Sequence, residues 1–149
     1  IYDKATQYYE EATTGDADNE TLAQYFYELA QVTRVQGNIC KAIEYAREAV
    51  KNKEDYGDAY ILLGDAYIES RENLGDDFEQ RTAFWAAADK FIKAKNVDPS
   101  TSADANKRIN DYASQYPDGE ACFFRTLQDG DSYLVKGCIN EYTTVRSRK

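Results

Sequence analysis

Small and apolar residues recur along most of the chain at the spacing of one helix face. Ala42, Ala46 and Ala49 follow one another at intervals of four and three residues, and a similar stripe returns over residues 84–94. This spacing puts side chains on one side of a helix, so the pattern predicts amphipathic helices through about residue 116. The chain holds only two Pro and eight Gly, and this scarcity of helix breakers favours a mainly α fold.

The helical pattern repeats along the chain. Three residues have a counterpart of the same kind 34 residues further on: Phe26 with Tyr60, Leu29 with Leu63, and Ala30 with Gly64. A fixed period of this length is typical of helix-hairpin repeats. We predict one repeat over residues 22–54, with Gly37 between its two helices, and a second over 56–100. Residues 1–15 resemble the second half of a preceding unit, so we expect the chain to be a piece of a longer protein.

The second unit resembles the tetratricopeptide-repeat (TPR) family at eight positions, which are Tyr60, Leu63, Gly64, Tyr67, Ala87, Phe91, Ala94 and Pro99. It departs from the family by an insertion in the polar stretch 70–77, where we expect a longer loop or an extended helix. The resemblance implies a TPR-type antiparallel helix-hairpin superhelix. A helix over 102–115, starting at Ser102 and polar on one face, would then cap the array of residues 1–116.

Residues 117–149 differ in character from the array. Cys122-Phe123-Phe124 is an apolar cluster, residues 128–131 read as a turn, and residues 133–135 and 142–145 have strand propensity. They predict a short helix and a small β-hairpin packed on the array, because a lone hairpin is marginally stable in water. We expect Trp85 to be buried and to hold this extension, against the capping helix or Phe123 and Phe124.

The pattern of the second unit together with residues 122–124 and 139–146 resembles the C-terminal region of TPR proteins from Bacteroidetes. This resemblance implies a periplasmic or cell-envelope location; the alternative is the cytoplasm. The chain has no histidine and three cysteines, Cys40, Cys122 and Cys138, so a zinc site is disfavoured. Cys122 and Cys138 pair across the tail hairpin in one interpretation, and all three are buried thiols in the other, which we favour.

The net charge of −9 arises in the helical part, because residues 117–149 carry five acids and five bases. An acidic surface repels phosphate backbones and disfavours nucleic-acid binding. It favours a basic partner; the alternative is that the acid excess only aids solubility. No apolar run approaches the length of a membrane span, so no membrane insertion is expected.

These features favour a protein-interaction scaffold over an enzyme. Without histidine there is no Ser-His or Cys-His pair, no phosphate-binding loop is present, and no cofactor or metal is expected. We interpret the acidic runs 76–77 and 129–131 as solvated turns rather than calcium ligands. The resemblance places the partner, a peptide or helix, in a concave groove lined by Gln24, Tyr27, Glu28, Gln31, Arg34, Asp58, Ile61, Leu62, Asp65 and Ile68. The alternative function is a structural C-terminal cap of a longer solenoid with no ligand of its own.

Overall fold

The computed structural model describes residues 2–149, and 70% of the chain is helical. The mainly α fold with a small antiparallel sheet is therefore confirmed. Within the described residues the α-helices are α1 (Tyr2–Thr13), α2 (Asn19–Val35), α3 (Ile39–Asn52), α4 (Gly57–Glu69), α5 (Asp77–Val97), α6 (Ser102–Tyr112) and α7 (Gly119–Phe124). The strands are β1 (Ser132–Val135) and β2 (Glu141–Thr144). The expected half unit 1–15 includes Ile1, which lies outside the described residues.

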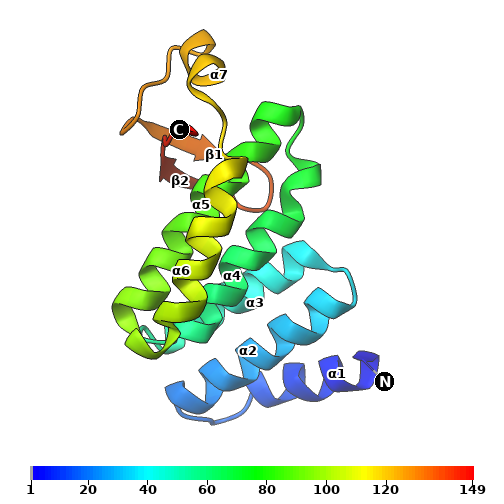
Figure 1. Ribbon diagram of the computed structural model, residues 1–149. Coiled ribbons are helices and arrows are strands. Elements are labelled where there is room, and N and C mark those ends of the chain that lie inside the picture. The colour runs from blue at the N-terminus through cyan, green and yellow to red at the C-terminus, as the bar shows by residue number, and fades with distance from the viewer. Residues whose placement is uncertain (1) are drawn as a thin grey trace.

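Consecutive helices pack as hairpins, with α2 against α3 and α4 against α5 (Figure 1). The small residues Ala42, Ala46 and Ala49 of α3 are fully buried, because the lack of bulk at these positions lets α2 approach closely. Gly64 plays the same part on α4, where a Cβ atom would come within 2.5 Å of the Phe91 ring on α5. The two hairpins span residues 19–52 and 57–97, and the predicted units span 22–54 and 56–100.

Aspartates define where several helices begin. The side chains of Asp18, Asp76 and Asp118 each accept a hydrogen bond from the backbone N–H three residues later, at 2.8, 2.9 and 2.8 Å. Such N-caps satisfy donors that the first helical turn leaves unpaired. The capping helix begins at Ser102, as predicted, and runs as α6 to Tyr112. Its cap position is Thr101, which ends a 3-10 turn over Pro99–Thr101.

The insertion extends secondary structure rather than forming an open loop. A 3-10 turn, Ser70–Asn73, follows α4 directly, and α5 is 21 residues long. Its added first turn carries Phe78, whose ring meets that of Tyr133 on β1 with centroids 6.1 Å apart. The guanidinium of Arg125, from the C-terminal extension, lies over the same Phe78 ring, 3.8 Å from its centroid. The insertion therefore builds the surface on which the C-terminal extension rests.

The C-terminal extension is a short helix and a hairpin, as predicted. β1 and β2 pair antiparallel with Val135 opposite Glu141, and both strands contact α5. Figure 1 places this extension at the opposite end of the molecule from α1. Among residues 2–149 no helix has both the length and the apolar character required to cross a membrane.

Trp85 joins the extension to α5. Its side chain is fully buried, and its Nε1–H donates a 2.6 Å hydrogen bond to the backbone oxygen of Arg146. The predicted burial is thus confirmed, but the expected contact with the Phe pair is wrong. Phe123 and Phe124 are 77% and 73% exposed, because six-residue α7 turns only Cys122 and the flanking Ala121 toward the core.

The cysteines pair differently from both sequence interpretations. Cys40 on α3 forms a disulfide with Cys138 in the loop between the strands, with Cα atoms 5.6 Å apart, and Cys122 is a buried free thiol. Pairing of Cys122 with Cys138 is therefore wrong, as is the expectation of three free thiols. The partners are 98 residues apart in sequence, so only the return of the tail to α3 brings them together.

Candidate partner-binding groove

Seven of the ten predicted groove residues line one surface depression of about 500 Å³ between α2, α4 and α6; these are Tyr27, Gln31, Arg34, Asp58, Ile61, Leu62 and Asp65. An adjoining depression of about 430 Å³ includes Ile68 and shares Arg34, Asp65, Glu69 and Arg108 with the first. We call the two together the α2–α4–α6 groove. Gln24 and Glu28 lie outside it on α2, where they bond to each other at 3.4 Å.

The apolar members form the floor of the groove. Ile61 and Leu62 are only 8% and 4% exposed, and both belong to the hydrophobic core, as does Ile68. Their main role is therefore in the hydrophobic core, and a partner would contact only the small part of each side chain that is exposed. Tyr27 is half-buried beside Tyr56, with ring centroids 5.1 Å apart. Burial, and to a lesser degree the nearby Asp58 carboxylate, raises the pKa of Tyr27 above its ordinary value. Its hydroxyl therefore stays a neutral donor.

Two ion pairs cross the groove and connect its three helices. Arg34 on α2 pairs with Glu69 at the end of α4. Arg108 on α6 binds both carboxylate oxygens of Asp65 on α4, at 2.9 and 3.1 Å. These hydrogen bonds raise the pKa of both arginines above the ordinary value. A bidentate pair fixes orientation as well as distance, so the groove walls are held in place without a ligand.

Two carboxylates of the groove remain without a cation. Within residues 2–149 neither Asp58 nor Asp104 makes a side-chain ion pair or hydrogen bond; Asp104 contributes only its backbone oxygen to Arg108. Both line the larger depression and both are exposed. The groove therefore carries a local negative charge that its own arginines do not neutralise.

Sequence reasoning missed the third wall of the groove. Asp104, Arg108 and Asp111 on α6 face it, together with Glu69 at the end of α4. The signal was present, since the three α6 residues stand at i, i+4 and i+7 and therefore share one helix face. From the sequence alone, this face is interpreted as the solvated side of a capping helix. The structure instead gives α6 the place of a further groove helix.

Within the described residues, no group of three or more His, Cys, Asp and Glu side chains lies where it would hold a metal ion. Burial raises the pKa of the Cys122 thiol above its ordinary value, which lowers its thiolate fraction and hence its reactivity. The groove offers hydrogen-bonding groups, charged side chains and an apolar floor, and these are the features with which a protein binds a partner.

No protein-family model matches this chain, and the search of curated proteins found no match.

Proposed function

We propose that the chain is a TPR-type protein-interaction module whose α2–α4–α6 groove binds a peptide or helical segment of a partner protein. The motif positions support the repeat type. Tyr60, Leu63, Gly64 and Tyr67 lie on α4, facing α5 or the neighbouring α3, and Phe91 fills the space that Gly64 leaves. Gly64 and Phe91 are two of the eight positions at which the chain resembles the family.

One observation carries the choice of partner. The larger depression contains four carboxylates and two guanidiniums, and both guanidiniums are already paired with Asp65 and Glu69. An incoming lysine or arginine would find Asp58 and Asp104 unneutralised, beside the exposed amide of Gln31. A partner segment with basic residues next to an apolar stripe fits this groove. Charge complementarity of this kind governs partner choice and association rate more than raw affinity.

We further propose that the protein works in an oxidising compartment such as the periplasm. The support is the disulfide between Cys40 and Cys138, because disulfides persist in oxidising compartments and are rare in the cytosol. A cell-envelope location also fits the resemblance of the tail.

The proposal is tested by charge reversal in the groove. Immobilised protein should capture a specific set of proteins from an envelope extract, and Asp58→Lys with Asp104→Lys should abolish that capture. A photo-crosslinker placed at exposed Gln31 should attach to the same partner, and the crosslinked peptide should be rich in Lys or Arg. The matched control is Asp77→Lys with Glu72→Lys, which makes the same change of four charges at two exposed sites outside the groove.

The alternative function is a structural cap with an idle groove. It is favoured by the two ion pairs that already occupy the groove, Arg34 with Glu69 and Arg108 with Asp65. In that case the charge-reversed protein and the control would recover the same proteins in the same amounts. Unchanged circular dichroism of the variants ensures that a loss of capture reports binding and not unfolding.

A further inference from the structure

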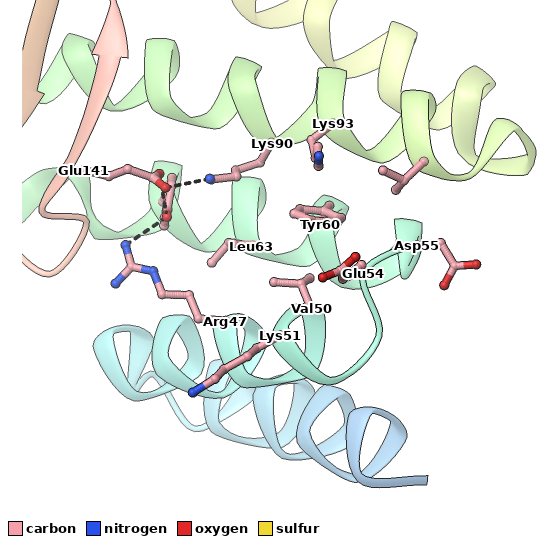
Figure 2. Close-up of a pocket in the computed structure, with 12 residues that line it drawn as sticks. Arg47, Val50, Lys51, Glu54, Asp55, Tyr60, Leu63, Lys90, Lys93 and Glu141 are labelled. Atoms are coloured by element: carbon pink, nitrogen blue, oxygen red, sulfur yellow. Dashed lines mark hydrogen bonds and ion pairs between the residues drawn. The ribbon is translucent and has the colours of Figure 1, made fainter. Parts of the chain in front are cut away.

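A second cleft lies on the other side of α4 from the groove. It has a volume of about 830 Å³ and is formed by α3, α4, α5 and Glu141 of the tail (Figure 2). α4 turns Tyr60, Leu63 and Tyr67 toward it, whereas Asp58, Leu62 and Asp65 face the groove. We call it the α3–α5 cleft. Because the two hollows use opposite faces of one helix, a ligand in one does not contact the other.

The charge of the α3–α5 cleft is opposite to that of the chain. Four cations line it, Arg47, Lys51, Lys90 and Lys93, against the three carboxylates of Glu54, Asp55 and Glu141. The whole chain, in contrast, has a net charge of −9. Figure 2 shows Lys90 and Lys93 on α5 facing Arg47 and Val50 on α3, with Tyr60 and Leu63 of α4 between them.

The cleft has a small net positive charge, and within the described residues only one of its four cations is ion-paired. Lys90 pairs with Glu141 at 2.7 Å, but within residues 2–149 Arg47, Lys51 and Lys93 form no ion pair. Arg47 donates to the Tyr67 hydroxyl at 2.9 Å and to the backbone oxygens of Cys138 and Ile139. The Tyr67 hydroxyl in turn donates to Glu141 at 2.9 Å, so the Glu141 carboxylate lies at this end of the cleft, paired with Lys90 and one hydroxyl away from Arg47 (Figure 2).

The rest of the cleft combines an apolar surface with an acidic end. Val50, Leu63 and Val97 supply aliphatic surface and Tyr60 an aromatic ring. Glu54 and Asp55 follow α3 and lie near Tyr60, away from Arg47 (Figure 2). A second negative charge on the ligand would meet these carboxylates. The cleft is thus suited to a single carboxylate at one end and an uncharged apolar group beside it.

We propose that the α3–α5 cleft is a second binding site, for a carboxylate attached to an apolar group. The carboxylate lies between Arg47 and Lys93, which form no ion pair within residues 2–149, and the apolar group lies on Val50, Leu63 and Tyr60. The C-terminal residue of a peptide and a free N-acylated amino acid share this chemistry. The site is independent of the groove, so it stands whether or not the groove binds a protein.

The test compares an acid with its own amide. N-acetyl-leucine and N-acetyl-leucine amide are titrated into the isotope-labelled full chain, and backbone amide shifts are followed by NMR. The acid should shift residues 47–63 and 90–97 with a dissociation constant about fivefold lower than that of the amide, the ratio expected for one partly exposed ion pair of about 1 kcal/mol. Equal shifts for the two compounds, or shifts confined to α2 and α6, would overturn the proposal.

Lys93→Gln supplies the second arm of the test. It removes a cation that has no ion pair in the described part of the chain, so the fold should be unaffected and the preference for the acid should disappear. Lys95→Gln, on the same helix but bonded to Asn106 on α6, is the matched control and should keep the preference. A Lys93→Gln protein that still prefers the acid contradicts the site. A tripeptide ending in leucine then separates the sources, because tighter binding than N-acetyl-leucine indicates a peptide terminus and equal binding a small acid.

Discussion

At the scale of single residues, Gly64 on α4 packs tightly against the ring of Phe91 on α5. A Cβ at position 64 would approach three ring atoms of Phe91 to 2.5–2.9 Å, and Phe91 is itself buried. Alanine normally stabilises a helix relative to glycine by about 1 kcal/mol. Here overpacking should win, and we expect Gly64→Ala to lower the free energy of unfolding by about 1–3 kcal/mol in urea titrations.

Two further variants isolate the cause. Gly119→Ala, at the start of α7, adds a Cβ with no atom within 4 Å and should leave stability nearly unchanged. Phe91→Leu should cost stability alone but less in the Gly64→Ala protein, because a smaller side chain makes room for the methyl group. Strictly additive losses would show that the two residues do not interact, and the close-packing explanation would fail.

At the scale of elements, the helices and strands could be predicted from local sequence patterns, whereas the contacts between distant residues could not. The Ala42, Ala46 and Ala49 stripe predicted α3 because helix periodicity is a local property of the sequence. The strands at 133–135 and 142–145 were found from β-propensity and turn residues for the same reason. The exposure of Phe123 and Phe124 was not foreseen, since an apolar cluster does not tell which of its residues the next element covers.

The β-hairpin depends on one carboxylate of α5. Asp89 accepts a 2.6 Å hydrogen bond from the Thr143 hydroxyl and pairs with the guanidinium of Arg146. Thr143 is buried, so Asp89→Ala leaves a buried hydroxyl without its acceptor at a cost of about 1–3 kcal/mol. We expect faster amide hydrogen exchange in β2 and at residues 129–131, with α2 and α3 unchanged, as measured by mass spectrometry.

The control for the hairpin is Asp77→Ala on the same helix. Asp77 is 83% exposed and, within residues 2–149, pairs only with Arg81 one turn away, an interaction of about 0.3–0.5 kcal/mol. The Asp77→Ala variant should have the same rate of amide hydrogen exchange in β2 as the unmodified chain. If both variants loosen β2 equally, the effect comes from the charge of α5 and not from the contact between Asp89 and the hairpin.

At the scale of the whole molecule, the groove was partly predictable and the second cleft was not. Seven predicted residues gather between α2 and α4 because a 34-residue repeat puts equivalent residues of successive first helices side by side. Arg108 was missed because α6 lies after the second hairpin, outside the two units that the 34-residue period relates. The α3–α5 cleft depends on Glu141 of the tail, and the position of the tail depends on the pairing of Cys40 with Cys138, which no local spacing indicates.

This disulfide should also be the largest single contribution to global stability. Its two cysteines are 98 residues apart in sequence. Closing a loop of about this length lowers the entropy of the unfolded chain and so destabilises the unfolded state by about 4–5 kcal/mol. Reductant should therefore lower the urea midpoint of the unmodified chain markedly. The Cys40→Ser and Cys138→Ser double variant should have the lower midpoint from the start and should not respond to reductant.

Cys122→Ala decides between the two possible pairings of Cys138. The variant keeps its sensitivity to reductant if Cys40 is the partner of Cys138, and it loses that sensitivity if Cys122 is the partner. A midpoint that is the same with and without reductant in the unmodified, fully oxidised chain would contradict the stabilising role of the link between α3 and the tail.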